Sequence, residues 1–358
     1  MLFVNARYLT QELTGVQRFA EQISLSLKVI RDDVVFLAPP GVLRNNVANK
    51  LQVREIGSKS GHFWEQIELP RYLKKNGSGL LLNLGSTAPV FYNNQIVTHH
   101  DVTYKRYPES FSRKFRLLYG FLIPMMLKNS QRLITVSEFS KKEINEVYNH
   151  PKEKISVIYN AASDAFKKKT IAGNTEKYLL AVSSPNFHKN FHGMLKAFSL
   201  LEGKYDVSLK IIGKTATSFS KQDFSSLINN SDKIKFMGRV EDDEMICLYQ
   251  NALAFVFPSF YEGFGIPPLE AQACGCPVIS SNMASMPEIL RDSAIYFDPS
   301  DEVGIASAME RIILDNDLRV NLIRNGDFNV KRFSWDASAA KISKMVDDLL
   351  FIKEIQAQ

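Results

Sequence analysis

Short apolar runs alternate with longer amphipathic stretches along the whole chain. This alternation is typical of parallel βαβ units, in which helices cover both faces of a sheet of buried strands. In the first half, the predicted strands are Leu2–Val4, Val34–Ala38, Gly79–Leu84, Gln95–His99, Arg132–Val136 and Ile155–Ile158. In the second half, they are Tyr178–Val182, Ser208–Ile212, Ile234–Phe236, Leu253–Phe257, Val278–Ser280 and Ile295–Phe297. Each set predicts one doubly wound α/β sheet.

A polar segment without hydrophobic periodicity, residues 160–177, separates the two sets and is predicted to be a linker. A chain of 358 residues also exceeds what one hydrophobic core usually organises. We therefore expect a Rossmann-like domain over 1–165 and a second one over 166–335. An amphipathic helix over 336–358 is expected to pack back on the first domain. Two such domains facing across a cleft would present the carboxyl ends of their strands to a ligand.

Composition and the lack of targeting signals indicate the compartment in which the protein acts. The hydrophobic content of 45% and the charged content of 23% are those of a globular protein. The N-terminus alternates like a strand and does not resemble a signal peptide, and the longest nearly apolar stretch, Leu117–Leu127, is too short to span a bilayer. Three cysteines without a disulfide or zinc spacing fit a reducing compartment. These features predict a cytoplasmic protein.

The basic residues are concentrated in the first half. Residues 1–168 contain 24 Lys and Arg against 14 Asp and Glu, whereas the remainder contains 20 against 24. The excess favours an anionic partner such as a membrane surface or a lipid phosphate, although a solvated basic face explains any single cluster equally well. Nucleic acid is disfavoured, because the aromatic residues do not alternate with the basic ones as a stacking platform requires.

The segment Pro258–Glu270, PSFYEGFGIPPLE, is the most informative part of the sequence. A predicted strand stops at a proline, a loop follows in which Gly263 and Gly265 let the backbone approach a ligand, and two prolines open a helix. Helix-start N–H groups favour an anion there. Of the two glutamates, Glu262 lies in the loop and is the better candidate to touch a reacting sugar. Glu270 is placed in the first helical turn, where stabilisation by the helix dipole competes with ribose binding.

Three further positions follow predicted strands. Lys189 precedes a helix-like run, where its ammonium group can neutralise a diphosphate, although one such lysine alone is more often a surface residue. His100 and Asp101 lie at a strand's carboxyl end, where histidine can position a hydroxyl or move a proton. His99 is interpreted as packing. Gly15 permits close backbone approach to a phosphate, and a plain turn explains it equally well.

Several motifs are given structural interpretations. Ser140 and Glu143 fit a capping box that starts a helix. Asp315-Asn316-Asp317 resembles a metal-binding pair of aspartates, but no strand precedes it, so a loop or helix cap is predicted and no metal site is assigned. GFGIPP is only half of a dinucleotide fingerprint, which disfavours a nicotinamide cofactor. No cofactor is expected.

Several segments together resemble the retaining nucleotide-sugar glycosyltransferases of family 4, which have the GT-B fold. The matching segments are TGVQRF, THHDVTYKRYPESFS, LITVSEFSKKEI, VIYNAASDAF, HKNFHGMLKAF, IKFMGRV and AFVFPSFYEGFGIPPLEAQACGCPVISSNMASMPEIL. They follow the family's order over nearly the whole chain. The resemblance implies hexosyl transfer with retention, without a bound metal.

The resemblance also implies roles for individual residues. In the second half, Glu270 should bind the ribose hydroxyls, Glu262 should lie by the donor sugar, and Lys189 should bind the diphosphate. The backbone of Phe264-Gly265-Ile266 should lie beside the sugar, and Gly238-Arg239-Val240 should flank the base. In the first half, His100 should reach the donor sugar or the reaction centre, and Gly15 should approach the phosphates.

One position departs from the family. An arginine often follows the strand before the phosphate-binding lysine, but this chain has Ser183-Ser184 there. His188 or Arg239 is a candidate to supply the missing charge, and Lys189 with backbone N–H groups is the third option.

GHFWEQIELP and TGVQRF resemble the branch that builds bacterial O-antigen or capsule chains, often mannosyltransferases that use GDP-mannose. A lipid-linked or oligosaccharide acceptor is expected, and rhamnosyl, fucosyl or glucosyl transfer stays open. Basic residues flank the FLIPMML run, which predicts peripheral contact with anionic lipid on the inner face of the cytoplasmic membrane; they are Lys105, Arg106, Arg113, Lys114 and Arg116. The alternatives are a nucleotide-sugar epimerase of the same fold and a non-catalytic scaffold in a polysaccharide assembly complex.

Overall fold

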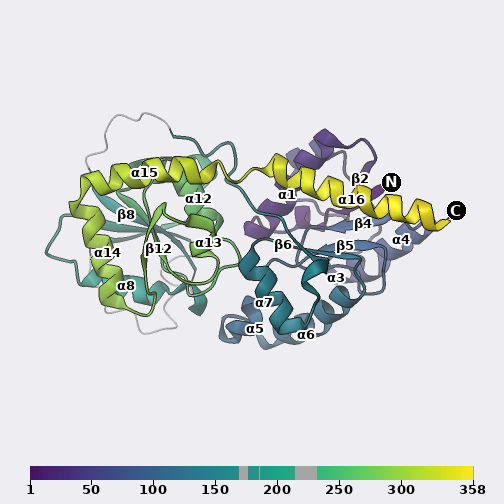
Figure 1. Ribbon diagram of the computed structural model, residues 1–358, viewed down its shortest axis with the longest axis horizontal. Coiled ribbons are helices and arrows are strands. Elements are labelled where there is room, and N and C mark those ends of the chain that lie inside the picture. Colours follow the sequence, from purple (N-terminus) through teal and green to yellow (C-terminus); the bar gives the residue numbers. More distant parts are fainter. Residues whose placement is uncertain (169–175, 185, 214–231, 358) are drawn as a thin grey trace. The chain divides into compact units, whose positions relative to one another are not determined.

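The computed structural model describes residues 1–168, 176–184, 186–213 and 232–357, so residues 169–175 of the predicted linker lie outside the described residues. The chain forms two compact units (Figure 1). Unit 1 comprises Met1–Lys105, Phe111–Asn160 and Phe333–Gln358, and unit 2 comprises Arg106–Ser110 and Ala161–Arg332. The predicted boundaries at 165 and 335 differ from these by a few residues. They also place Arg106–Ser110 in the first domain, whereas the side chains of that segment pack in unit 2.

Unit 1 is built on a seven-stranded parallel sheet with the order β3-β2-β1-β4-β5-β6-β7. The strands are β1 Leu2–Asn5, β2 Val34–Ala38, β3 Arg54–Glu55, β4 Leu80–Asn83, β5 Gln95–Thr98, β6 Arg132–Thr135 and β7 Ile155–Val157. The sequence predicted all of them except β3, a two-residue exposed edge strand without apolar side chains. The order reverses between β1 and β4, as in a doubly wound sheet.

The helices of unit 1 cover this sheet. They are α1 Gly15–Ile30, α2 Asn45–Leu51, α3 Gly61–Phe63, α4 Leu69–Lys75, α5 Thr103–Arg106, α6 Arg113–Lys128, α7 Glu138–Tyr148 and α16 Trp335–Ala357; only the last residue of α5 is assigned to unit 2. Helix α16 lies against α1 (Figure 1). The ring of Trp335 contacts Phe19 of α1, and Arg31 forms a 2.6 Å ion pair with Asp347. The last helix of the chain is therefore part of unit 1.

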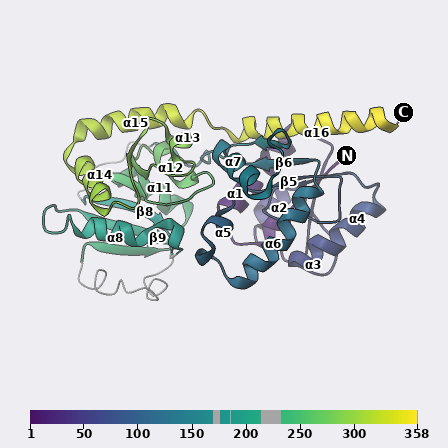
Figure 2. The same cartoon turned by 60° about the horizontal axis from the view of Figure 1, so that its bottom comes forward.

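Unit 2 contains a six-stranded parallel sheet with the order β10-β9-β8-β11-β12-β13. The strands are β8 Tyr178–Ser183, β9 Ser208–Gly213, β10 Ile234–Gly238, β11 Ala254–Phe257, β12 Val278–Ser281 and β13 Ala294–Phe297, all near their predicted positions. The described helices are α8 Phe191–Ser199, α11 Asp242–Asn251, α12 Ile266–Ala273, α13 Met286–Leu290, α14 Glu302–Leu314 and α15 Asn316–Val330. Helix α8 packs on α14, whereas α12 packs on α11 and α15 (Figure 2). The strand order again reverses once, between β8 and β11.

Of two helix caps predicted from the sequence, the structure contains one. The capping box at Ser140 and Glu143 is wrong: helix α7 begins at Glu138, and Ser137 is its cap, because the Ser137 hydroxyl accepts the Ser140 N–H at 2.9 Å. The cap at Asp315 is confirmed, since its carboxylate accepts the Leu318 N–H at 2.8 Å at the start of α15.

In the described part of the chain, no helix is both long enough and apolar enough to cross a bilayer.

Candidate functional site

The carboxyl ends of β8 and β11 mark the reversal point of the unit 2 sheet. The two strands are neighbours, but the chain continues from β8 to one side of the sheet and from β11 to the other. Doubly wound proteins bind ligands at the carboxyl ends of such a pair of strands. Lys189 lies in the loop after β8, and Glu262 lies in the loop after β11.

Lys189 ends a 3₁₀ turn, Phe187–Lys189, which leads into α8. The next residue, Asn190, has a left-handed backbone (φ 49°) and donates a 2.6 Å hydrogen bond to the Pro299 carbonyl, which fixes the start of α8. The Lys189 ammonium forms a 2.5 Å ion pair with Glu262, and the two side chains are 26% and 14% exposed. The structure thus brings together a cation and a carboxylate from two loops at the reversal point.

The loop that carries Glu262 is held by three serine hydroxyls. Ser259 donates to the Glu262 carboxylate at 2.7 Å, and Ser281 donates to the Ser259 carbonyl at 2.7 Å. The Ser285 hydroxyl lies 2.9 Å from the Glu262 carbonyl and 3.1 Å from that of Phe264. Glu262 is therefore preorganised from both its side chain and its backbone.

Helix α12 begins where this loop ends. Gly265 precedes it with φ +93°, and a β-carbon at this position would lie 2.5 Å from the terminal methyl carbon of Met286. Only glycine satisfies both conditions without movement. Gly263, Phe264 and Ile266 are all buried around it. The backbone thus turns sharply into a helix N-terminus, which favours an anion.

Glu270 lies in the second turn of α12, not in the first turn as predicted, because the helix begins at Ile266. The favourable interaction with the helix N-terminus falls off within the first turn, so it explains Glu270 less well than the sequence indicated. The residue is buried, with 6% exposure.

Gly238 is the last residue of β10, an edge strand that β9 separates from β8, and Arg239 and Val240 follow it. Gly238 has φ +71°, and Arg239 is exposed. His188, the other candidate for the missing positive charge, is buried, and its Nδ1 lies 2.9 Å from the Ser110 hydroxyl. Nδ1 of His188 is therefore already hydrogen-bonded within the protein.

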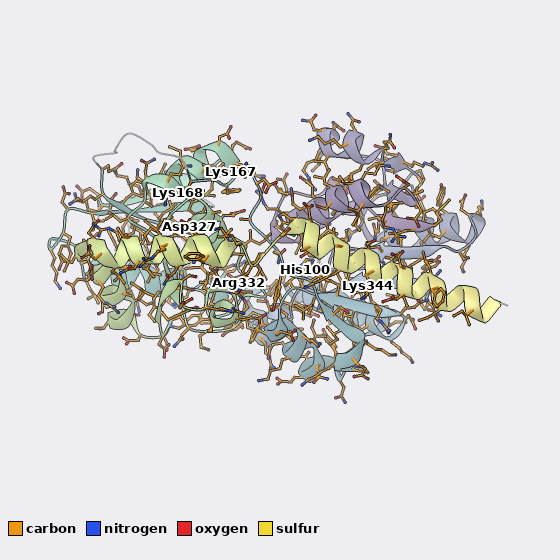
Figure 3. The ribbon with its side chains drawn as sticks, turned by 45° about the horizontal axis from the view of Figure 1, so that its top comes forward. His100, Lys167, Lys168, Asp327, Arg332 and Lys344 are labelled. Carbon is orange, nitrogen blue, oxygen red and sulfur yellow. The ribbon has the colours of Figure 1, made fainter. Side chains whose placement is uncertain are left out.

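His100 and Gly15 belong to unit 1. His100 follows β5 (Figure 3), is 7% exposed, and places Nε2 3.2 Å from the Leu84 carbonyl. Because a carbonyl only accepts, Nε2 carries a proton. Burial lowers the pKa of His100 despite this hydrogen bond and the charge of Asp101, so the imidazole is neutral at pH 7. Its ring packs edge-on against Phe19 of α1, the helix that Gly15 begins.

His99 is packed, as its place in the sequence indicated. It is 1% exposed, and its Nε2 lies 3.2 Å from the Tyr104 hydroxyl. Burial and the neighbouring His100 lower its pKa to about 4, against the opposing effect of Asp101.

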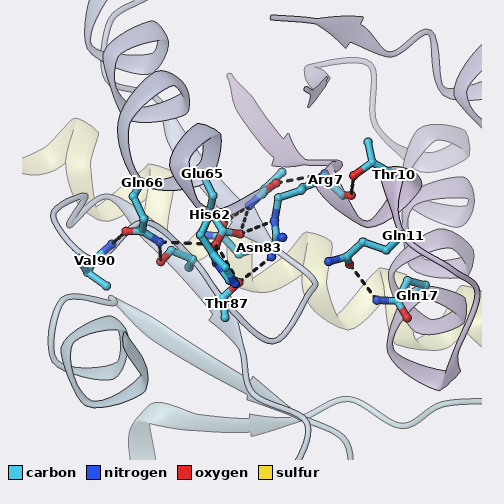
Figure 4. Close-up of polar contacts among 12 residues, drawn as sticks. Arg7, Thr10, Gln11, Gln17, His62, Glu65, Gln66, Asn83, Thr87 and Val90 are labelled. Carbon is cyan, nitrogen blue, oxygen red and sulfur yellow. Dashed lines mark hydrogen bonds and ion pairs between the residues drawn. The ribbon is translucent and has the colours of Figure 1, made fainter. Parts of the chain in front are cut away.

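A polar network that the sequence did not reveal lies at the reversal point of the unit 1 sheet (Figure 4). Its centre is Glu65, 1% exposed, in a π-helical turn, Trp64–Glu68. Glu65 contacts Arg7 at 3.1 Å, and Thr87 donates to it at 2.8 Å. Asn5 at the end of β1 also donates to Glu65, at 3.2 Å. Buried carboxylates and π-helical turns both occur often at functional sites.

The charge on Glu65 is maintained by its partners. Burial raises the pKa of this carboxyl, but the Arg7 charge together with hydrogen bonds from His62 and Thr87 outweighs burial and lowers the pKa to about 2. Glu65 is therefore ionised at neutral pH. The only sequence signal for it was an acidic residue that directly follows two aromatic residues, in FWEQI.

The structure thus distributes the predicted residues over three places. Lys189 and Glu262 meet at the reversal point of unit 2, where Gly263-Phe264-Gly265-Ile266 leads into α12 and Glu270 follows one turn later. Gly238-Arg239-Val240 lies beyond an intervening strand. His100 and Gly15 lie in unit 1.

Comparison with known proteins identifies two family matches that together cover most of the chain. The family described as "Glycosyltransferase Family 4" matches residues 15–165, and "Glycosyl transferases group 1" matches residues 162–327. The O-antigen chain mannosyltransferase RfbU of Salmonella typhimurium is 36% identical over 67% of this chain and 66% of that protein. The O-antigen chain mannosyltransferase B of Escherichia coli is 30% identical over 67% of each. The chain thus spans about two thirds of the length of these relatives.

Among solved structures, HepE of Anabaena in complex with UDP and glucose superposes with a TM-score of 0.76. The match covers 97% of this chain and 99% of that one, at 16% sequence identity. At this identity, the likeness concerns the fold, which is GT-B.

Proposed function

Because the chain belongs to glycosyltransferase family 4, we propose that it transfers mannose from GDP-mannose to a lipid-linked saccharide or oligosaccharide in bacterial surface polysaccharide synthesis. The observation that carries the proposal is the Lys189–Glu262 pair at the reversal point of unit 2, beside the N-termini of α8 and α12. The donor assignment is supported by the mannosyltransferase names of the two relatives. The same names leave the epimerase and the scaffold as the less favoured alternatives.

In the proposed reaction, Lys189 binds the donor diphosphate and Glu262 contacts the sugar. A phosphate must compete with Glu262 for the Lys189 ammonium, and a hydroxyl of the sugar then satisfies the carboxylate. Glu270 binds the ribose hydroxyls. As the bond between the anomeric carbon and the phosphate oxygen breaks, Lys189 and the helix N-termini stabilise the departing negative charge.

We further propose retention of the anomeric configuration, without a bound metal. The acceptor hydroxyl attacks the anomeric carbon from the face that the diphosphate leaves, and its proton passes to the departing phosphate oxygen. The acceptor is proposed to bind unit 1, where the Glu65 network occupies the reversal point of the sheet. Roles for His100, Gly15 and the Gly238–Val240 loop stay predictions.

Peripheral membrane contact is proposed for helix α6. Leu117, Leu118 and Phe121 are exposed on one face of this helix, and Lys114 and Lys128 flank them. An exposed apolar stripe bordered by lysines suits a surface of anionic lipid.

A panel of sugar nucleotides tests the donor assignment. Thermal unfolding of the full chain is measured with GDP-mannose, UDP-glucose and a TDP-sugar, and GDP-mannose is expected to give the largest rise in midpoint. NMR of the product from GDP-mannose and an acceptor then reports the anomeric configuration, with and without a chelator. Donor rearrangement without acceptor would favour the epimerase, and no stabilisation by any nucleotide would favour the scaffold.

A further inference from the structure

Five residues that interrupt the unit 1 part of the sequence belong to unit 2. Lys105 and Phe111 are part of unit 1, but the segment between them, Arg106–Ser110, packs with unit 2. We call it the clasp segment. Its 3₁₀ turn, Pro108–Ser110, contacts the 3₁₀ turn Phe187–Lys189, which carries the proposed phosphate-binding lysine.

Ser110 fixes His188 in two ways. Its hydroxyl lies 2.9 Å from Nδ1 of the His188 ring and 3.4 Å from the His188 backbone nitrogen. The His188 carbonyl in turn accepts the Phe260 N–H at 2.8 Å. One hydroxyl therefore anchors a residue that ties the loop after β8 to the loop after β11.

Tyr107 packs against rings from the same two loops. Its ring lies nearly parallel to Phe260, with centroids 6.4 Å apart, and it also contacts Tyr261 and Phe187. No hydrogen bond of the Tyr107 hydroxyl is found within the described residues. The contribution of Tyr107 is thus its ring, because aromatic pairs at these separations attract one another beyond simple burial.

The residues that the clasp segment holds are direct neighbours of the proposed donor site. His188 precedes Lys189, and Phe260 and Tyr261 precede Glu262. Because consecutive Cα atoms are only about 3.8 Å apart, fixing His188 and Phe260 limits where Lys189 and Glu262 lie. The 2.5 Å ion pair shows that the two loops are held at a definite separation.

We propose that the clasp segment is part of the donor site: Tyr107 and Ser110 are positioning residues that hold the loops of Lys189 and Glu262 at the separation a diphosphate requires. The proposal rests on the proposed function for the identity of the ligand. A purely structural clasp lowers the stability of unit 2 and leaves ligand affinity unchanged, whereas a positioning clasp acts on affinity through Lys189.

The test compares matched variants of the full chain by calorimetric titration with UDP and GDP. Tyr107→Ala removes the ring and Ser110→Ala removes the hydroxyl, and each is expected to weaken binding of the preferred nucleotide about tenfold. Tyr107→Phe and Ser110→Thr keep the ring and the hydroxyl and are expected to bind like the wild type. In the double variant Tyr107→Ala with Lys189→Ala, the two losses should not add, because the ring acts through the lysine.

A second readout does not depend on a ligand. Hydrogen exchange in Tyr107→Ala and Ser110→Ala should accelerate in peptides covering 186–190 and 258–264, with β13 unchanged as the internal control. Unchanged exchange in both loops overturns the clasp whatever the nucleotide result. Wild-type affinity in both alanine variants, or losses that add to that of Lys189→Ala, also overturns it while the proposed function stands. If the wild type binds neither nucleotide, the proposed function fails, and the donor role of the clasp fails with it.

Discussion

The ammonium group of Lys189 lies 2.5 Å from the carboxylate of Glu262, although the two residues are 73 positions apart in the sequence. Lys189 lies in the loop after β8 and Glu262 in the loop after β11. Because these two strands are neighbours in the sheet, their loops come together. The residue proposed to bind the diphosphate and the residue proposed to contact the sugar are thus paired with each other in this structure.

Glu262→Gln is expected to strengthen the binding of inorganic pyrophosphate and to reduce sugar transfer. The substitution removes the charge that competes for Lys189, so the ammonium is released to a phosphate, while the proposed contact to the sugar is weakened. Titration with pyrophosphate measures the first effect, and turnover of the sugar nucleotide measures the second. Ser259→Ala keeps the charge and serves as the control. Weaker pyrophosphate binding in Glu262→Gln would contradict the competition.

The contributions of Glu270 and Lys189 to binding are expected to differ between pyrophosphate and a nucleoside diphosphate. A charge-assisted hydrogen bond contributes about 1.5–3 kcal/mol, or roughly 10- to 150-fold in affinity. Lys189→Ala should therefore weaken both pyrophosphate and the nucleoside diphosphate, whereas Glu270→Gln should weaken only the ligand that contains ribose. Equal losses for both ligands in Glu270→Gln would show that the glutamate supports the loop and does not bind the pentose.

The strand pattern of both sheets was predictable because each central strand is buried and apolar. β11, Ala254–Phe257, is a clear example, with every residue buried. The edge strand β3, Arg54–Glu55, was not predictable, since it is exposed, polar and two residues long. The cap of α7 was misplaced because Ser137 and Ser140 both precede acidic helical residues, and only the backbone conformation shows which one caps.

The candidate site was predictable only where local sequence determines it. Gly265 and the two prolines after it specify a loop that turns into a helix, and this is what the structure contains. Glu65 was missed because its partners, Arg7 and Thr87, come from distant parts of the chain. The clasp segment was missed for the same reason, since only its tertiary contacts assign it to unit 2.

Gly265→Ala should destabilise unit 2 more than a comparable substitution elsewhere. An alanine with positive φ costs about 1–2 kcal/mol, and at Gly265 its β-carbon would also meet Met286 at 2.5 Å. Gly203→Ala is the matched control, because its φ is +77° and no atom lies within 4 Å of the new carbon. Thermal unfolding of both variants measures the difference, and Met286→Ala should rescue only the steric part. Equal shifts in both variants would refute the steric contribution.

The acid stability of unit 1 should depend on Glu65. Its folded pKa of about 2 lies below the usual value of 4.5, so the charged form stabilises the fold above pH 4.5 and this contribution is lost as the pH falls toward 2. The shift corresponds to about 3 kcal/mol. Glu65→Gln should remove most of this pH dependence and, because Arg7 then loses its ion-pair partner, destabilise unit 1 at neutral pH.

The two tryptophans of the chain, Trp64 and Trp335, both lie in unit 1, so their fluorescence in urea reports this unit. The surface pair of Glu146 and Lys142, 3.9 Å apart, provides the control Glu146→Gln, which should change stability by less than about 1 kcal/mol. An unchanged slope of stability against pH in Glu65→Gln would contradict the assignment.

Helix α6 should bind anionic vesicles through its exposed apolar face. Leu117 is 78% exposed and Phe121 60%, with Lys114 one turn away, so insertion of the apolar groups and attraction of the lysine act on the same surface. Phe121→Gln is expected to abolish sedimentation of the full chain with phosphatidylglycerol vesicles, and high salt should weaken the wild type. Phe328→Gln, at a residue of unit 2 that is 65% exposed, should bind like the wild type. If the two variants lose binding equally, or if neutral phosphatidylcholine vesicles bind as well as anionic ones, α6 is not the membrane contact, because exposed apolar area alone would then account for adsorption.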